Sequence, residues 1–579
     1  MNLNHSIITY ILLAPLIGAV LIALLPDRGK LSAWVALLTS LVSFGLTLHL
    51  PAHFLVGQPG YQFEINRRWI ERPAIYYHVG VDGLSLWLVV LVGLLAPVGV
   101  LASWNAINER KKVFYSLFMV QQTAMFGVFL ALDLMVYYGF WELSLVPMAV
   151  LIAMYGRKDG PHAAGRFFLF TFIPSAPLLV AILYLYKETG SFDFEQLQYS
   201  IASGVIPANA LFWCGLAFLF AFAVKVPVFP LHGWLAETFS EAPVALAMVV
   251  AGKLGLYSML RFHVMLFPQQ ARAIAPLVIA LGVIGILYGA CLALVQRDFF
   301  RLIAFATLGH FSVTTLGIYG LNLIGRDGAV FLMVSQGVIE GALFVLLGVL
   351  ENRYATSQIG SYGGVAARLP RTATFFVITS LAMIGLPLLN GFVGEFLVLS
   401  STFTSVSRGW AIAATVTVIL GAGYMLWLVQ RLFYGPESAM AASQPVEDLR
   451  FHEIAVLAPL AALMLAMGVA PGYWLQSIEK SSAPYGVVQQ VTAVEPAKSH
   501  EAALVAAGTN VLRDSSKNGL SGAEARVSLA SLAALKSCPD TKPSRGEVFS
   551  LLQASCRFEA ATFSETAPSA VATATEAQR

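Results

Sequence analysis

Apolar stretches long enough to cross a lipid bilayer recur through most of this chain, from Ile7 to Trp474. A helix needs about 20 consecutive apolar residues to span the hydrocarbon core. Inside that core the backbone polar groups must bond to one another, which leaves helices and closed barrels as the spanning structures. With 58% hydrophobic and 12% charged residues in 579, the sequence predicts an all-α polytopic membrane protein.

The apolar stretches predict about 14 transmembrane helices, each with the length that a bilayer requires. They lie near residues 7–25, 31–50, 82–103, 112–131, 133–154, 165–186, 209–229, 242–262, 274–296, 301–320, 328–350, 374–404, 409–433 and 453–475. The seventh span contains the sequence Lys225–Pro230, and the twelfth contains Gly385–Pro387 followed by Asn390 and Gly391. Because proline removes a backbone donor, both helices are expected to be discontinuous.

The two broken spans lie five helices apart, which is the arrangement of transporters built from inverted repeats. An odd number of helices per repeat gives the repeats opposite orientations. The predicted division is residues 1–110 for helices 1–3, 111–265 for the first five-helix repeat, 266–436 for the second, 437–481 for the last transmembrane helix, and 482–579 for a C-terminal tail. The tail is rich in Ala, Ser, Thr and Glu and predicts a mostly disordered, low-complexity segment.

Several kinds of site are not indicated. The four cysteines form no CxxC pair, so we expect neither an iron–sulfur cluster nor a zinc site. The chain has no GxGxxG or GxxxxGK[ST] motif, and we expect no bound nucleotide. A net charge of +3 does not suggest a nucleic-acid partner.

The basic residues predict the topology. The first hydrophobic segment has neither a basic start nor a small-residue cleavage site, so it is interpreted as a retained helix. The loops with Arg28, Arg110, Arg157, Arg297 and Arg353 fall on one side, which predicts that this side is cytoplasmic. Both termini would then be periplasmic in a bacterial inner membrane. A disulfide between the tail residues Cys538 and Cys556 would suit that oxidising compartment.

Ionisable residues within the apolar spans are the candidate functional residues, because charges in a membrane are costly and usually mark ion or proton pathways. The candidates are Glu142, Lys225, Lys253, His310 and Glu395, together with His232 after the first helix break. Each also has a structural alternative: a satisfied buried acid, a lysine that reaches the interface, or a histidine with a local packing role. Asp82, before the third span, is interpreted as a helix N-cap.

Two acids, two lysines and two histidines can form a proton relay. A Glu–Lys pair about 4 Å apart, at an effective dielectric constant near 20, is coupled by about 4 kcal/mol. That coupling corresponds to roughly 3 pK units. Making and breaking the pair can therefore switch a lysine between accepting and donating a proton. The helix break beside Lys225 supplies unpaired backbone that can hold water.

Several motifs resemble the antiporter-like membrane subunits of NADH-quinone oxidoreductase, most closely those of the chain M or chain 4 type. The resemblance covers roughly residues 5–476, and its motifs are Val81–Leu86, Phe140–Leu143, Val146–Met148, Ala221–Pro227, His232–Leu235, Glu241–Pro243, Arg301–Ala304, Phe392–Phe396 and Arg431–Pro436.

This resemblance implies a fourteen-helix fold with two inverted five-helix repeats and a central hydrophilic axis. It implies that Glu142, Lys225, Lys253 and Glu395 carry protons along that axis. Redox chemistry would occur on other subunits, so this chain would hold no NADH, flavin, iron–sulfur cluster or quinone. Energy would reach it through neighbouring membrane subunits, including related antiporter-like ones.

The chain departs from the family pattern at three places. The stretch between Glu241–Pro243 and Lys253 is about three residues shorter than usual, nearly one helical turn. Phe300 replaces a basic residue, and Gln336 replaces a histidine. Glu340 follows Gln336 by four residues, on the same helix face. We hypothesise that Glu340 takes over part of the missing histidine's task; the alternative is an acid near the membrane surface or paired with an arginine.

Three other functions remain open at this stage. Subunits of multisubunit sodium/proton antiporters and of membrane-bound hydrogenases share the Glu and Lys motifs. Asp448–Arg450 with Glu453 favours the chain M type. A structural spacer that no longer pumps is a third possibility, and the presence of all four axis charges argues against it.

Overall fold

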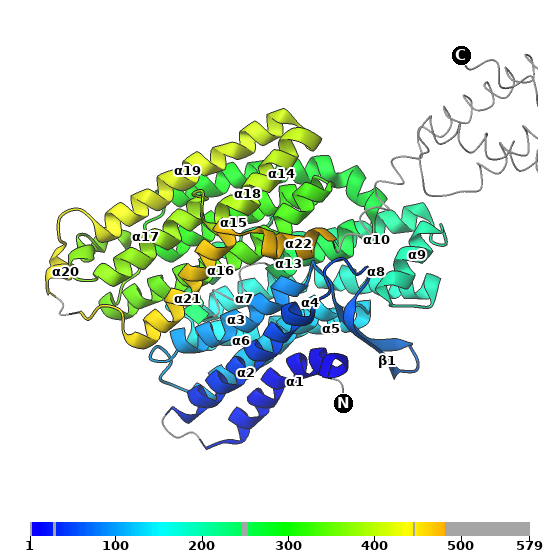
Figure 1. Ribbon diagram of the computed structural model, residues 1–579, viewed down its shortest axis with the longest axis horizontal. Coiled ribbons are helices and arrows are strands. Elements are labelled where there is room, and N and C mark those ends of the chain that lie inside the picture. Colours follow the sequence, from blue (N-terminus) through cyan, green and yellow to red (C-terminus); the bar gives the residue numbers. More distant parts are fainter. Residues whose placement is uncertain (1–2, 27–29, 246–252, 444–445, 481–579) are drawn as a thin grey trace, which may run out of the picture. The chain divides into compact units, whose positions relative to one another are not determined.

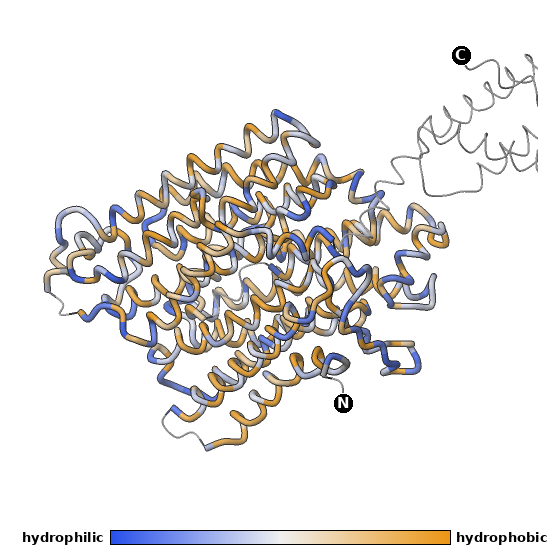
Figure 2. Tube along the Cα trace, viewed as in Figure 1, coloured by the Kyte–Doolittle hydropathy of each residue, from blue (hydrophilic) through white to orange (hydrophobic). Residues whose placement is uncertain are grey.

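The computed structural model describes residues 3–26, 30–245, 253–443 and 446–480 (Figure 1). The predicted tail domain, residues 482–579, and the predicted Cys538–Cys556 bridge lie outside these residues. Within them the protein is a bundle of long helices, and Figure 2 shows hydrophobic residues along the helices and hydrophilic ones gathered at their ends.

The elements of the N-terminal part are α1 (Leu3–Leu24), α2 (Leu31–His53), β1 (Gln62–Ile70), β2 (Ile75–Val81), α3 (Leu86–Ala102), α4 (Lys111–Leu130), α5 (Leu134–Leu143), α6 (Leu145–Tyr155), α7 (Gly160–Phe172), α8 (Ser175–Thr189), α9 (Phe194–Ala202), α10 (Ala208–Lys225), α11 (Leu235–Glu241), α13 (Lys253–Ser258) and the π-helix η1 (Met259–Val264).

The C-terminal part contains α14 (Pro268–Val295), α15 (Phe299–Tyr319), α16 (Leu323–Tyr354), the 3₁₀ turns η2 (Ile359–Ser361) and η3 (Val365–Ala367), α17 (Pro370–Ile384), α18 (Asn390–Ser401), the π-helix η4 (Thr402–Val406), α19 (Arg408–Phe433), α20 (Ala439–Ser443), α21 (Phe451–Val469) and α22 (Gly472–Lys480).

The predicted membrane-spanning character is confirmed. Eleven helical segments of the described residues are long and apolar enough to cross a membrane, and α3 and α17 are apolar but shorter. The total of about 14 spans stays a prediction. Helices α15 and α16 are buried along their membrane-spanning lengths, whereas α1 and α2 expose large apolar side chains, as lipid-facing helices do. The centre of the bundle therefore lies around α15 and α16.

Both predicted helix breaks are present. Helix α10 ends at Lys225 and α11 begins at Leu235, and the indole N–H of Trp234 donates to the Val224 carbonyl across the break (2.9 Å). This bond satisfies one of the carbonyls that an interrupted helix leaves unpaired. Helix α17 ends at Ile384, Gly385 adopts a left-handed conformation (φ 78°), and α18 begins at Asn390.

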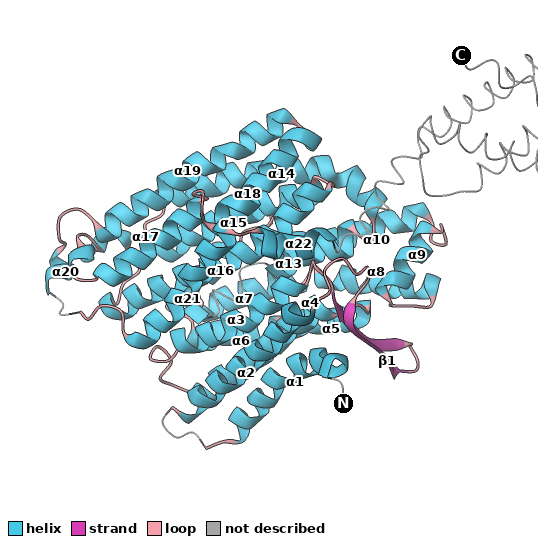
Figure 3. Cartoon of the chain, viewed as in Figure 1, coloured by secondary structure: helices cyan, strands magenta, loops and turns pink. Residues whose placement is uncertain are grey.

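A β-hairpin between α2 and α3 was not predicted (Figure 3). Strands β1 and β2 pair antiparallel with two register irregularities. The β-branched and aromatic residues of Ile75–Val81 were the available strand signal. The hairpin is tied to the bundle by the backbone N–H of Tyr76, which donates to Asp133, the N-cap of α5 (3.1 Å).

Candidate functional site

Lys225, the last residue of α10, is buried at the first helix break, with 8% of its surface exposed. Its ammonium group lies 5.5 Å from the centre of the Trp141 ring and 5.2 Å from that of Phe167. These distances allow cation–π attraction from both rings. The position is deep in the protein, which argues against a lysine that reaches the interface.

Glu142 lies near the C-terminal end of α5, directly after Trp141. The predicted single span 133–154 is divided at Ser144, whose hydroxyl donates to the Trp141 carbonyl (2.7 Å). Glu142 is half-buried, and the charges of Glu142 and Lys225 interact through space. No ion pair within 4 Å joins these two described residues, so the acid and the lysine are near each other without direct contact.

His232 lies in the turn between α10 and α11 and is half-buried. Its ring stacks on Phe229 (5.6 Å between centres) and meets Tyr288 of α14 edge-on (5.0 Å). Its Nδ1 atom is buried and has no hydrogen-bond partner among the described residues. The structure thus places His232 at the first break, packed by aromatic rings, with a ring nitrogen available for a proton.

Lys253 and Glu340 form a direct ion pair between α13 and α16. Both side chains are buried, and Glu340 is 0% exposed. The partner of Glu340 is thus a lysine and not an arginine, and the side chain lies in the interior of the protein. The structure joins two predicted site residues that are 87 positions apart in the chain.

The beginning of α13 packs tightly against the first helix break. A Cβ atom on Gly255 would lie 2.7 Å from the Val226 Cγ2 atom and 3.0 Å from the Val226 backbone nitrogen. Glycine is therefore required for this approach. Lys253, two residues earlier, is brought beside the break. The residues in which the chain is shorter than the family pattern, 246–252, lie outside the described residues.

His310 of α15 connects α16 with α18. Its Nδ1 atom lies 2.9 Å from Glu395 Oε1 and 3.1 Å from Gln336 Nε2. All three side chains are buried. One ring nitrogen cannot donate to the carboxylate and accept from the amide at once, so the two contacts correspond to different protonation states of His310.

Glu395 also lies at a helix break. A Cβ atom on Gly385 would be 2.7 Å from Glu395 Oε2, so the carboxylate packs against the left-handed glycine that ends α17. Lys225 and Glu395 therefore occupy equivalent situations: each is a buried charge beside an interrupted helix. This is the environment in which a membrane protein can expose unpaired backbone to an ion or to water.

Several buried polar atoms in this region have no hydrogen-bond partner among the described residues. They are Glu142 Oε1, His232 Nδ1, His310 Nε2, Gln336 Oε1, Glu340 Oε1 and Glu395 Oε1, and further such atoms lie outside the predicted site, for example on Gln121 and Gln122. Most buried polar groups in proteins are paired, and exceptions call for an explanation. On the predicted site residues these atoms are acceptors open to a transferred proton.

Two buried polar contacts near the site were missed. Arg261 of η1 pairs with Asp82 (2.5 Å), and His263 Nδ1 lies 2.9 Å from the Tyr319 hydroxyl. Asp82 makes the contacts predicted for an N-cap: its carboxylate accepts from the amides of Leu84 and Ser85, and its carbonyl accepts from the Leu86 amide, although α3 itself begins only at Leu86. The signal was available: Arg261 lies inside a predicted span, where a charge needs a partner.

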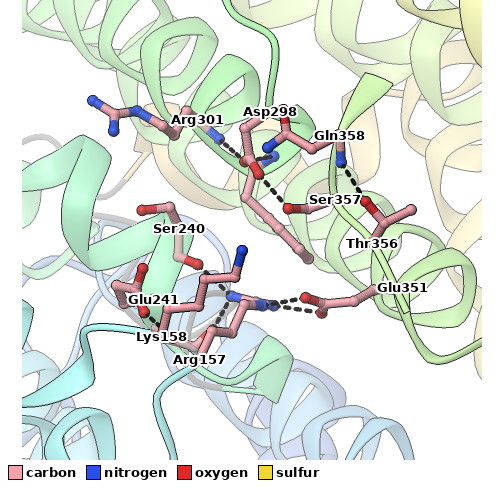
Figure 4. A network of polar contacts seen from close by, with 12 residues as sticks. Arg157, Lys158, Ser240, Glu241, Asp298, Arg301, Glu351, Thr356, Ser357 and Gln358 are labelled. Atoms are coloured by element: carbon pink, nitrogen blue, oxygen red, sulfur yellow. Dashed lines mark hydrogen bonds and ion pairs between the residues drawn. The ribbon is translucent and has the colours of Figure 1, made fainter. Parts of the chain in front are cut away.

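A polar network joins helix ends from both predicted repeats (Figure 4). Arg157, between α6 and α7, binds both oxygens of Glu351 at the end of α16 (2.6 and 2.9 Å) and donates to the Ser240 and Ala242 carbonyls. Its guanidinium lies 3.8 Å from the centre of the Phe300 ring, at the position where the chain departs from the family pattern. At this position the family has a basic residue; here Phe300 stacks against the guanidinium of Arg157 instead.

No group of three or more His, Cys, Asp or Glu side chains suited to a metal ion is found among the described residues. Cys214 is buried and Cys291 exposed, and neither is in a disulfide.

Comparison with known proteins decides the family. The family described as "NADH:quinone oxidoreductase/Mrp antiporter, TM" matches residues 131–421. Subunit M of the NADH-quinone oxidoreductase of Rhodobacter capsulatus is 38% identical in an alignment of 488 positions that covers 80% of this chain and 93% of that protein. The chain belongs to this family. Chain 4 of the NADH-ubiquinone oxidoreductase of Chondrus crispus is 34% identical, over 81% of this chain and 96% of that protein.

Solved structures agree with this assignment. A chain of respiratory complex I from Thermus thermophilus with bound NADH superposes with a TM-score of 0.76 and 31% identity, over 83% of this chain and 99% of that chain. A chain of the Mrp complex from Dietzia superposes with a TM-score of 0.74 at 19% identity, over 84% and 99%. The second match shows the shared antiporter-like fold alone.

Proposed function

We propose that this chain is the proton-translocating membrane subunit of a complex I-type NADH-quinone oxidoreductase, of the subunit M kind. The observation that carries the proposal is the set of buried and half-buried ionisable residues at and between two helix breaks: Glu142, Lys225, His232, Lys253, His310 and Glu395. Such residues are expensive in a membrane and have little purpose there except to carry charge.

Protons would move along this set by alternate pairing. Lys225 gives up its proton when Glu142 moves away and regains one when Glu142 approaches, because an adjacent carboxylate favours the charged amine. Lys253 then receives the proton, and His310 and Glu395 carry it onward. His232 provides an exchange site at the first break. The cation–π contacts hold the Lys225 ammonium without neutralising it, which keeps it ready to exchange.

Under this proposal the redox centres of the complex are held by partner subunits. Flavin, iron–sulfur clusters and quinone are held by other subunits of the complex, and this chain, part of an oxidoreductase translocase, contributes no redox centre. Its neighbours are other membrane subunits, including related antiporter-like ones. The location is a bacterial inner membrane, with both termini periplasmic.

The test is Glu142→Gln in the whole complex, reconstituted in vesicles. NADH oxidation by quinone and acidification of the vesicle lumen are measured together. We expect the assembled variant to lose most proton pumping, since glutamine cannot take up a proton. Glu188→Gln is the matched control and should pump normally, because this half-buried acid pairs with the exposed Lys187 near the end of α8. Full pumping by Glu142→Gln would contradict the proposal.

An Mrp-type antiporter subunit is the second candidate, because the matching family includes both kinds. Purification with partner subunits separates them. Flavin, clusters and NADH–quinone activity in the particle support the first proposal. A particle without redox centres that exchanges sodium for protons supports the second. A particle that has redox centres and evolves hydrogen would indicate a membrane-bound hydrogenase instead.

A further inference from the structure

We propose that Glu340 is a proton-exchanging residue that links Lys253 to His310, so that on α16 a carboxylate passes the proton. The inference deepens the proposed function and rests on it. Nothing in the family comparison assigns a role to this position. The contacts of Glu340, and those of Gln336 one helical turn away, support the inference.

Glu340 lies in the middle of α16, completely buried, with Oε2 on the Lys253 ammonium and Oε1 without a partner among the described residues. A carboxylate used only to neutralise Lys253 needs no free oxygen. The unpaired Oε1 is buried and available as a second proton site.

Stabilisation of the fold does not explain the Lys253–Glu340 ion pair. A buried ion pair is weak evidence of stabilisation, because taking two charges out of water costs about as much as their attraction returns. An apolar pair of similar size would fill the space between α13 and α16 at no greater cost. Retention of two charges here is therefore better explained by a reaction than by packing.

Gln336 and Glu340, both on α16, differ in whether they can exchange a proton. Gln336 and Glu340 are four residues apart and lie on one helix face, about 6 Å apart along the axis. Gln336 contacts His310 and Glu340 contacts Lys253. The amide of Gln336 can neither release nor accept a proton near neutral pH, whereas the carboxylate of Glu340 can. On this face of α16, Glu340 is thus the titratable group between the lysine and the histidine.

Lys253 also lies close to α15, the helix that carries His310. Its ammonium lies 5.4 Å from the centre of the Phe311 ring, the residue directly after His310 on α15. His310 Nε2 is buried and unpaired among the described residues. The acceptor side of His310 is thus open, on the helix that Lys253 already contacts.

The proton balance is simple. The Lys253 ammonium transfers one proton to the Glu340 carboxylate, which leaves an amine and a carboxylic acid, both neutral. The acid then releases that proton to the imidazole of His310, directly or through a water molecule. Glu340 is again a carboxylate, and His310 is an imidazolium beside Glu395, 2.9 Å away. The Gln336 amide must turn to present its oxygen to the charged ring.

The test compares variants of α16 in the reconstituted complex. Glu340→Gln keeps size and hydrogen bonding but cannot carry a proton, so the rate of proton pumping, measured as a ratio to NADH oxidation, should fall about 100-fold or more, as the loss of a positioned acid or base typically costs. Glu340→Asp, which keeps the acid, should recover much of the ratio. The double variant Gln336→His with Glu340→Ser should also recover it, because it returns a titratable group to this face.

The control is Asp327→Asn, which removes a buried carboxylate paired with Arg326 on the same helix, away from the Lys253 pair. It should pump normally. Normal pumping by Glu340→Gln together with failure of Glu142→Gln would overturn the Glu340 inference and leave the proposed function intact. Equal loss in Glu340→Gln and Glu340→Asp, without recovery in the double variant, would show that Glu340 only positions Lys253.

Discussion

The two halves of the buried charge set are arranged differently. In the first half Lys225 lies between two aromatic rings, and Glu142 is near without touching it. In the second half the ionisable groups are in direct contact, Lys253 with Glu340 and His310 with Glu395. A contact at about 4 Å and an effective dielectric constant near 20 is worth about 4 kcal/mol. Free energy must be supplied to open the second half, whereas the first half is already open.

This difference indicates where a conformational signal would act. A small movement of Glu142 towards Lys225 strengthens their through-space attraction and creates a direct contact that the structure does not have. In the second half, a comparable movement has to break a contact that already exists, either Lys253 with Glu340 or His310 with Glu395. The helix break beside Lys225 provides the local freedom for such a movement, since the interrupted backbone has fewer internal hydrogen bonds.

The largest effect is expected for Lys225. Lys225→Ala should abolish pumping, and Lys225→Arg should not restore it, because arginine keeps its proton at every accessible pH. Vesicle acidification driven by NADH is the measurement, with Lys187→Ala on the exposed end of α8 as control. Normal pumping by the arginine variant would show that the first half needs only a fixed positive charge.

A smaller effect is expected for the rings around the two lysines, and it separates the halves. Trp141→Leu should slow pumping clearly, since the ring attraction, about 0.5–2 kcal/mol, is what holds the unpaired Lys225 charge. Phe311→Leu removes a ring at a similar distance from Lys253, yet it should pump almost normally because Glu340 remains in contact. Equal losses in the two variants would contradict the difference between the halves.

The smallest effect concerns the hairpin, which contacts the start of α5 and hence the helix of Glu142. His78 on β2 touches Asp193 (2.5 Å) and Glu64 (2.8 Å). Burial opposes the charge on His78, but these carboxylates raise its pKa above 6.5. Burial likewise opposes the charge on Asp193, and the hydrogen bond from His78 leads the contacts that hold its pKa below 3.8.

The sign of the pH effect follows from the two shifts. The His78 contribution is complete below its unfolded pKa of about 6.5 and is lost as the pH rises through the higher folded value. The Asp193 contribution is present above about 3.8 and is lost as the pH falls through the lower folded value. The protection factors of the hairpin amides, which are the intrinsic exchange rates divided by the observed rates at the same pH, should therefore be highest between about pH 4 and 6.5. His78→Gln should remove the loss of protection above that range; an unchanged profile of protection factors against pH would contradict this prediction.

Much of this site could be predicted because its signals are local. A run of apolar residues gives a spanning helix wherever it occurs, and Pro227 and Gly385 interrupt helices through their own backbone chemistry. A glutamate, lysine or histidine inside such a run is conspicuous without any knowledge of its neighbours. The hairpin was missed because its strand signal is short and lies between strong helix signals.

The sequence by itself determined that the chain spans a membrane, where two of its helices break, and that Lys225, Lys253 and Glu395 are buried. Only the tertiary structure decided which charges meet. The Lys253–Glu340 contact joins α13 to α16, and the His310–Glu395 contact joins α15 to α18. Such pairings depend on how helices pack, and packing depends on many weak contacts between distant side chains. Gly255 shows the reason in one position: a missing side chain lets α13 approach Val226, and this approach places Lys253 beside the helix break.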